Sequence, residues 1–564
     1  MIRLRIKSFL RILKYCRKLL PETCVKFTVI KTYKNIAAQV CLYLLLAFSL
    51  TATISAQQIA PALFDYVELN QLYDEENLSP ALQTKLDKLL TTPFVDNSLA
   101  ANAPVNFSKS AALGEFLRVV EWNIERGLEY PAIETVFSDG NSFEAMLDKK
   151  TFPLESDERQ RALEQAAMLR QADVIILNEV DFGMKRTDYR RVAEDLARRL
   201  KMNYAFGVQF VELSPVELNR ETVGESEREK EFAKLVKVDP ARYKGLHGLA
   251  ILSRFPLENV RLVPFKEKPY DWFTGEKTGA SLLEQGKRKI AGRIFLEKTL
   301  REVRRGGRTM LLADINDSRF PNGRVTIAAT HLENRTKSAS RVRQLKELLA
   351  LIKNIPNPVV VAGDMNTSSS DLTPTSIRRE LVKRYGNPAY WIRRGIGYVL
   401  GFGLIEDTVL DGLTFWRKKS DPTVRHIPFL MPNSERKFFS TLEDFRFADG
   451  GAFDFRGDAQ HSYRNKNRTL ANSNERGGKG FVNTYQVARP IKFIGKYKLD
   501  WIFVKPANLK KPTDRKGSYR FAPHFGRTFD EVNQSVPDRI SDHRPIMVDL
   551  PLNEPPFNKT LNRK

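Results

Sequence analysis

The stretch Val174-Ile175-Ile176-Leu177-Asn178-Glu179 is the clearest indication of the fold of this 564-residue chain. Its four large apolar residues, three of them β-branched, predict a strand that is buried on both faces. Glu179 follows almost at once, so a carboxylate lies where the strand ends. Strand ends and the loops that follow them are where functional side chains gather.

Helices and strands alternate on both sides of this stretch, from about residue 116 onwards, which predicts an α/β fold. A helix capped by Ser156 or Asp157 precedes it and ends at Arg170. Four further signals lie outside it: a strand over 116–122, a helix marked by Tyr189, Val192, Leu196 and Leu200, a helix marked by Val342, Leu345, Leu349 and Ile352, and a buried strand over 358–362. Asn322-Gly323 lies between apolar runs and predicts a hairpin.

Seven short islands of this kind carry polar residues at the end of an apolar run. In chain order they are residues 121–125, 177–180, 247–254, 330–333, 363–366, 499–503 and 541–545. Together they supply carboxylates, carboxamides and three imidazoles, with almost no sulfur. Such a set suits an oxygen-liganded divalent cation that acts on a phosphate ester.

The overall composition is that of a globular protein, with 42% hydrophobic and 28% charged residues. The net charge of +24 favours anionic partners such as nucleic acid or phospholipid head groups. Residues 1–34 hold ten basic residues and one acid, so the remainder of the chain carries about +15. All three cysteines lie within the first 41 residues, which excludes a thiolate metal site or a disulfide framework elsewhere.

An apolar run over 36–56 follows the basic leader and has no charged residue. Its length suffices to cross a bilayer, and the basic flank predicts a cytoplasmic N-terminus. A signal peptide cleaved near Ala56 is the rival interpretation, and a buried core helix is a third. We therefore expect export, either anchored in the inner membrane with the catalytic domain outside the cytoplasm, or periplasmic or secreted.

We divide the chain into five parts. These are a basic cytoplasmic leader (1–34), an anchor or signal segment (35–57), a lead-in or linker (58–115), the main domain (116–552) and a tail (553–564). An irregular, aromatic-rich stretch at about 371–490 is interpreted as a long insertion in the main domain.

In this order, the seven islands resemble the endonuclease/exonuclease/phosphatase superfamily, in its deoxyribonuclease and neutral sphingomyelinase branch. The resemblance covers roughly residues 116–552. It implies a four-layer α/β sandwich, with two mixed β-sheets packed face to face, helices outside and long insertions. It also implies Mg²⁺ as the cofactor, with Mn²⁺ or Ca²⁺ as alternatives.

The resemblance assigns the metal ligands. Glu179 is implied as the principal ligand, and Asn123, Glu125 and Asp542 as its neighbours at the metal. Asn123 and Glu125 flank Ile124, so both side chains leave the same face of the strand. Taken alone, Glu179 is equally compatible with a surface carboxylate.

The resemblance also assigns the catalytic residues. Asp364 orients or deprotonates the attacking water, and Asn366 donates a hydrogen bond to the phosphoryl group. Asp500 holds the tautomer of His543, which contacts the scissile phosphate. His331 can donate a proton to the leaving oxygen, or it can be a hydrogen-bonded histidine that supports the site.

The island at 247–254 is expected to face the phosphate, with Arg254 and His247 as phosphate contacts. Apurinic-site endonucleases carry a Tyr just before the corresponding Gly, where this chain has His247. This difference and His331 favour the other branches. We expect a phosphodiesterase that acts on nucleic acid or phospholipid and associates with the membrane through residues 36–56. A phosphomonoesterase of the inositol-phosphate type and a non-catalytic binding protein are the alternatives, and no protein partner can be inferred.

Overall fold

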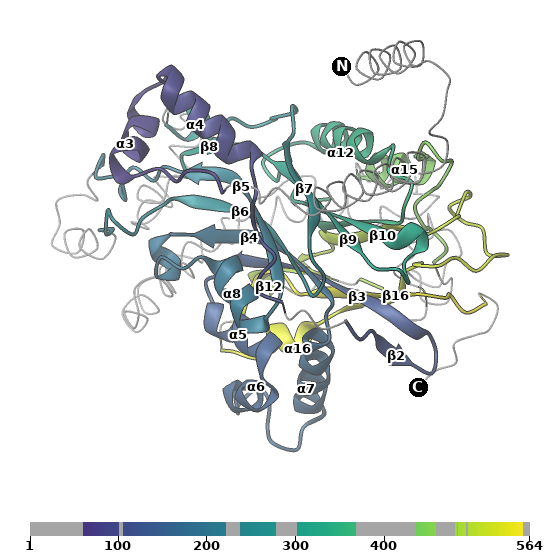
Figure 1. The fold of residues 1–564 in the computed structure, drawn as a ribbon. Coiled ribbons are helices and arrows are strands. Elements are labelled where there is room, and N and C mark those ends of the chain that lie inside the picture. Colours follow the sequence, from purple (N-terminus) through teal and green to yellow (C-terminus); the bar gives the residue numbers. More distant parts are fainter. Residues whose placement is uncertain are drawn as a thin grey trace, which may run out of the picture. The chain divides into compact units, whose positions relative to one another are not determined.

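The stretch from Val174 onwards forms strand β4 (Val174–Phe182), the middle strand of the larger of two sheets in the computed structural model (Figure 1). The structure describes residues 60–100, 105–221, 237–277, 302–367, 435–457, 476, 480–481, 483–491, 494–537 and 539–556. The chain divides into two units, Met1–Ile59 and Ala60–Lys564, and every described residue belongs to the second.

The larger sheet has the strand order β1-β5-β6-β4-β3-β16-β15, with β2 added on β3 and β8 on β5. Its other strands are β1 (Phe94–Asp96), β2 (Ser108–Ser110), β3 (Gly114–Arg126), β5 (Asn203–Glu212), β6 (Leu246–Ser253), β8 (Arg304–Gly306), β15 (His524–Thr528) and β16 (Ile546–Pro551). Strands β3 and β4 run parallel, whereas β4 and β6 run antiparallel, so the sheet is mixed.

The smaller sheet has the strand order β14-β11-β10-β9-β7. Its strands are β7 (Glu258–Pro264), β9 (Thr309–Asn316), β10 (Arg324–Thr330), β11 (Val359–Asp364) and β14 (Asp500–Lys505). Strands β9 and β10 form the hairpin predicted around Asn322-Gly323, and both of these residues have positive φ. Strands β10 and β11 are parallel, and the helix α12 (Ser338–Ile352) connects them. A separate ribbon pairs β12 (Tyr485–Ile491) with β13 (Ile494–Tyr497).

The two sheets face each other, because β3 and β4 contact β11 and β3 also contacts β14. One apolar core joins both sheets to α12 and α15 (Arg436–Asp444), and a second lies between the larger sheet and its helices. Figure 1 shows α5, α7, α8 and α16 gathered along the larger sheet, away from α12 and α15. The predicted four-layer α/β sandwich is confirmed.

The remaining helices lie along the larger sheet or at its margins. They are α3 (Tyr66–Asp74), α4 (Pro80–Thr91), α5 (Tyr130–Ser138), α6 (Gly140–Met146), α7 (Asp157–Arg170), α8 (Val192–Leu200), α10 (Thr274–Lys277) and α16 (Asp530–Asn533). In α7, capped by Ser156 as predicted, the buried face carries Ala162, Ala166 and Leu169, while Leu163 is only partly buried. The two alanines are small, so this face can pack against α5 and α6. A search for large apolar residues does not predict that alanines form the buried face.

Two of the predicted parts of the chain pack against the main domain. The lead-in at 58–115 is more than a linker from residue 60 onwards, because β1 pairs with β5 and α4 packs on β5 and β7. The tail at 553–564 is anchored at its start, because the buried Glu554 carboxylate bonds the Arg456 guanidinium at 3.0 Å.

The predicted leader, the apolar run at 36–56 and most of the insertion at 371–490 lie outside the described residues. In the described part of the chain, no helix combines the length and the apolar character needed to cross a membrane.

Candidate active site

The polar ends of the islands meet at one edge of the two sheets. Asn123 and Glu179 lie at this edge, three residues before the ends of β3 and β4, and β11 ends there with Asp364. Strand β14 runs antiparallel to β11 and therefore begins at the same edge with Asp500, directly opposite Asp364. The loop before β16 brings His543 to this point. Five separate segments thus supply one site.

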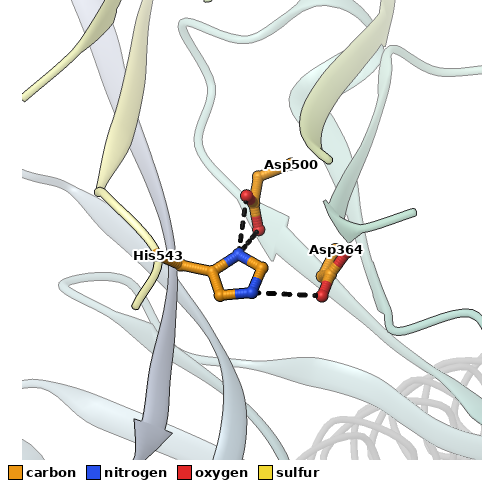
Figure 2. A group of neighbouring side chains, drawn as sticks. All are labelled: Asp364, Asp500 and His543. Atoms are coloured by element: carbon orange, nitrogen blue, oxygen red, sulfur yellow. Dashed lines mark hydrogen bonds and ion pairs between the residues drawn. The ribbon is translucent and has the colours of Figure 1, made fainter. Parts of the chain in front are cut away.

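His543 lies between two carboxylates (Figure 2). Its Nδ1 is 2.8 Å from one Asp500 oxygen and 3.0 Å from the other. Its Nε2 faces Asp364, whose Oδ2 is 3.7 Å away. Burial lowers the pKa of His543, but the Asp500 and Asp364 charges overcome this and hold it well above the usual value. The imidazole is therefore a cation that points Nε2 towards Asp364.

Asp364 is fixed on several sides. Its backbone N–H donates to the Asn178 side chain at 2.7 Å, and its Oδ1 accepts from the Asn366 backbone N–H at 2.8 Å. The Asn123 amide donates to Oδ2 at 3.3 Å. Burial, together with the charges of Asp500 and Glu179, raises the pKa of Asp364 to about 7 against the pull of His543. A carboxylate with such a pKa is suited to accept a proton near neutral pH.

His331 and Asn366 form the adjoining wall. The Asn366 amide nitrogen lies 3.1 Å from His331 Nε2 and donates to the Leu332 carbonyl at 3.0 Å. His331 Nε2 is 3.4 Å from Asp364 Oδ2. Burial first, and the Arg308 charge next, lower the pKa of His331 well below its usual value. A neutral imidazole in this network favours the supporting role over proton donation.

Three carboxylates lie together on the other side of Asp364. The Asp542 backbone N–H donates to Glu125 Oε2 at 2.9 Å. Burial, then the charges of Glu125 and Glu179, raise the pKa of Asp542 to about 7. The Glu179 carboxylate is only partly buried and has no hydrogen bond or ion pair within the described residues. Crowded carboxylate oxygens of this kind suit a hard divalent metal, so the predicted ligand set is chemically suitable.

A second arrangement also places possible ligands together. One ligand atom each from Asp364, Asp500 and His543 lie within 4.8 Å of one another. However, the Nδ1 of His543 already bonds Asp500, and Nε2 is the atom nearest Asp364. We interpret this group as a hydrogen-bonded chain and keep Glu125, Glu179, Asp542 and Asn123 as the metal-binding set.

The backbone is left-handed at several of these positions. Glu125, Glu179 and Asn366 have φ of 46°, 51° and 44°. Gly363 has φ of 145°, and a Cβ there would lie 1.7 Å from the Thr330 carbonyl oxygen. Strand β3 loses its regular pairing with β4 between Asn123 and Arg126. Non-glycine residues in this region are strained, and such strain gathers at functional sites.

Sequence reasoning missed two residues that complete the site. Asn178 pairs with Asn123 across β3 and β4 and holds the Asp364 backbone. Glu121 is fully buried, and neither of its carboxylate oxygens has a hydrogen-bond partner in the part of the chain that the structure describes. Burial, then Asp500 and Asp364, raise the pKa of Glu121 well above its usual value. Glu121 precedes Asn123 by two residues, so strand periodicity alone could have placed both on one face.

The end of the predicted insertion braces the site. The Thr484 hydroxyl accepts from the Asp500 backbone N–H at 3.1 Å, and the Tyr485 ring lies 4.8 Å from the His543 ring. Ser541 adds a further support, since its hydroxyl donates to the Asn123 carbonyl at 2.7 Å. None of these three residues was assigned a role from the sequence.

The two predicted phosphate contacts do not lie beside Asp364 as expected. Arg254 follows the far end of β6, where Ser253 pairs with Val174, so it lies at the opposite edge of the sheet from Glu179. Its guanidinium donates to the Arg170 carbonyl at 3.0 Å. His247 begins β6 at the site edge, but its Nδ1 bonds the buried Asp181 at 3.0 Å. Arg254 is thus withdrawn as a phosphate contact, and His247 belongs to a buried ion network beside the site.

A sequence profile of the Endonuclease/Exonuclease/phosphatase family matches residues 120–543, about three quarters of the chain. The chain therefore belongs to the endonuclease/exonuclease/phosphatase family, whose members hydrolyse phosphoester bonds. The predicted superfamily is confirmed.

Solved structures with a similar fold are distant in sequence. An endonuclease/exonuclease/phosphatase from Beutenbergia cavernae DSM 12333 is 16% identical, with 77% of this chain and 71% of that chain covered and a TM-score of 0.32. The human Nocturnin catalytic domain is 13% identical, with 80% and 98% covered and a TM-score of 0.30. An AP endonuclease from Archaeoglobus fulgidus is 12% identical, with 77% and 99% covered and a TM-score of 0.32. No curated protein sequence matches significantly.

Proposed function

We propose that this protein is a Mg²⁺-dependent phosphodiesterase. One observation carries the proposal: the chain Asp500–His543–Asp364 lies beside the oxygen donors of Glu125, Glu179 and Asp542. A cationic imidazole, a carboxylate with a pKa of about 7 and a set of hard oxygen donors are the groups that hydrolysis of a phosphate ester requires.

Each residue has a separate task in this proposal. Asp364 takes the proton of the attacking water. His543, kept protonated by Asp500, donates from Nε2 to a phosphoryl oxygen, and the Asn366 amide is positioned to do the same. Glu179, with Glu125, Asp542 and Asn123, would hold the metal, which neutralises phosphate charge when bound. Little covalent work is left to the protein, so positioning and charge supply most of the catalysis.

The substrate and the location are also proposals. The basic charge supports an anionic substrate, either nucleic acid or a phospholipid head group. A nuclease should lose affinity steeply as salt concentration rises, because phosphate contacts release counterions. A head-group hydrolase should instead depend on a lipid interface. The apolar run at 36–56 supports export, and hence action outside the cytoplasm.

Hydrolysis of bis-p-nitrophenyl phosphate tests the reaction. We expect Mg²⁺-dependent release of nitrophenol by the wild type that EDTA abolishes. Glu179→Ala and His543→Ala should each lower the rate at least about 100-fold, the loss typical of a missing electrostatic group.

Glu155→Ala is the matched control, because Glu155 is an exposed carboxylate away from the site. It should keep the wild-type rate. Equal rates in all four proteins, or no hydrolysis in any of them, would defeat the proposal.

A further inference from the structure

Arg308 lies beside the candidate site but has no part in the chemistry described above. It is the residue just before β9, and the next residue, Thr309, accepts a hydrogen bond from the Thr330 hydroxyl at 3.1 Å. Met310 pairs with Thr330, the last residue of β10, and His331 follows directly. After burial, the Arg308 charge is the largest influence that lowers the pKa of His331. Arg308 therefore adjoins the wall formed by His331 and Asn366.

The hydrogen-bond donors of Arg308 are unused within the described part of the chain. Its side chain is only 3% exposed, and its sole ion pair there is with Glu333 at 3.5 Å. Nε has no hydrogen-bond partner among the described residues. The same holds, within those residues, for Thr309 Oγ1, His331 Nδ1 and both amide atoms of the fully buried Gln209. Buried polar groups are normally satisfied, so a cluster of unsatisfied ones calls for a ligand or ordered water.

Aromatic rings lie against three guanidinium groups on this side of the site. Arg308 and Arg304 each lie 5.4 Å from the centre of the Phe210 ring. Arg304 and Arg335 lie 4.7 Å and 4.6 Å from the centre of the Trp272 ring. Stacked arginines lose little further freedom when they bind an anion, which makes this wall a pre-organised one.

Close ion pairs inside the fold balance the charge of the buried Arg304, whereas Arg308 has only one longer ion pair within the described residues. Arg304 bonds Glu212 at 2.9 Å and Glu302 at 3.0 Å. Glu333, the partner of Arg308, already accepts a shorter bond of 3.0 Å from the Trp272 indole N–H. Arg308 is thus left with a loose partner and a fork of free donors, the geometry that matches a phosphate in a bidentate contact.

We propose that Arg308 binds a second phosphate group of the substrate, one phosphodiester away from the phosphate that is cleaved. This inference rests on the proposed function and narrows the substrate class to a nucleotide chain. A choline head group would need aromatic faces for its cation. Here arginines already stack on Phe210 and Trp272, so the wall is built for an anion.

The test compares two chromogenic substrates that differ only in the second phosphate: thymidine 5′-(p-nitrophenyl phosphate) and the same compound with a 3′-phosphate. Wild type should prefer the 3′-phosphorylated compound by about 10- to 100-fold in kcat/KM, mainly through KM, as one or two charge-assisted hydrogen bonds provide. Arg308→Gln should lose the preference, and Arg308→Lys should keep part of it.

Arg261→Gln is the matched control, because Arg261 is an exposed arginine on β7, and it should keep the preference. Equal kcat/KM for the two compounds in wild type would overturn the inference without touching the proposed function, and so would an unchanged preference in Arg308→Gln. Should no compound be hydrolysed, the proposed function fails. In that case the affinities of thymidine 3′,5′-bisphosphate and thymidine 5′-phosphate, measured by calorimetry, test the second phosphate site independently of activity. If Arg308→Gln does not fold, wild type and Arg308→Lys carry the comparison.

Discussion

At the scale of single residues, the main feature of the site is a pair of neighbouring groups, Asp364 and His543, whose pKa values are both raised above their usual range. Asp364 and His543 face each other, and Asp500 acts on both. The Asp500 charge raises the pKa of the acid and of the imidazole alike. It therefore favours a proton on His543, which in the proposed mechanism donates to the phosphate, while Asp364 titrates near neutrality.

Replacing Asp500 by Asn tests this coupling. The proposed mechanism needs deprotonated Asp364, so kcat/KM should rise with pH up to about 7. The rise should come at lower pH once a bound cation lowers the Asp364 pKa. It should fall again when His543 loses its proton at higher pH. Loss of the Asp500 charge lowers both pKa values, so both limbs of the profile should move to lower pH.

The rate of Asp500→Asn should also fall by at least about 100-fold, because the imidazolium loses its partner. The measurement is a kcat/KM profile against pH for both proteins. Tyr519→Phe, which removes only a hydroxyl bonded to Asp514 outside the islands, is the control. A profile that keeps its position while the rate falls would show that Asp500 does not set these pKa values.

At the scale of elements, three strands meet tightly where β11 approaches β10 and β4. Gly363 lies with no side chain between the Thr330 carbonyl and Asn178, and a Cβ would come within 1.7 Å and 2.9 Å of their oxygens. This close approach lets the Asp364 backbone reach the Asn178 side chain. The two sheets are therefore joined by a hydrogen bond at the site itself.

Gly363→Ala should be strongly destabilising, by about 3 kcal/mol or more, because the new methyl group adds a clash to an unfavourable φ. Activity should fall with it, since Asp364 shifts. Chemical denaturation measures the loss of unfolding free energy. Gly323→Ala is the control: φ is 68° there and nothing lies within 4 Å of the added Cβ. It should cost only about 1 to 2 kcal/mol. Similar losses for both variants would show that the close approach is unimportant.

The elements themselves were largely predictable, because their signals are local. Apolar runs predicted β4 and β11, Asn322-Gly323 predicted the β9–β10 hairpin, and Ser156 predicted the start of α7. The edge at which a strand ends is not local information. Arg254 was placed at the site because it is the last residue of an island. However, β6 runs antiparallel to β4, so the end of β6 lies at the opposite edge.

The sequence also did not reveal which side chains of one sheet interact with residues of the other sheet. Asn178 and Glu121 stand inside quoted islands, yet their importance depends on Asp364 and Asp500, which lie on the other sheet. Pairing between distant segments decides which buried polar groups meet, and one sequence carries no direct record of that pairing. The resemblance to the family supplied the roles that strand patterns alone could not.

At the scale of the whole molecule, a second buried network, made of residues outside the site islands, joins separate segments of the fold. His524 on β15 lies 3.0 Å from Glu554, which also accepts from Arg456 at 3.0 Å. Asp454 joins Arg456 at 2.8 Å, and Arg476 bonds both acids. The C-terminal segment, β15 and two parts of the predicted insertion are thereby tied together.

This network makes stability depend on pH. Burial, then the Arg476 charge, lower the pKa of His524 from 6.5 to about 4. The unfolded chain binds a proton on this histidine below pH 6.5, whereas the folded chain does so only near pH 4. Its contribution is therefore present above pH 6.5 and is lost as pH falls to 4, on the order of 3 kcal/mol in all.

His524→Gln should remove this dependence. The difference in unfolding free energy between wild type and variant, measured by denaturant titration, should shrink as pH falls from 6.5 to 4. A difference that stays constant across this range would mean that His524 titrates alike in the folded and unfolded chain.

The left-handed backbone at Glu125, Glu179 and Asn366 has a consequence for how this protein can be changed. These are positions where glycine would relieve conformational strain, yet each carries an oxygen or amide that the chemistry uses. Selection for thermal stability alone would therefore remove activity first at these strand ends. The catalytic edge embodies a stability–activity trade-off, and directed evolution towards a more robust enzyme should find its gains elsewhere in the sandwich.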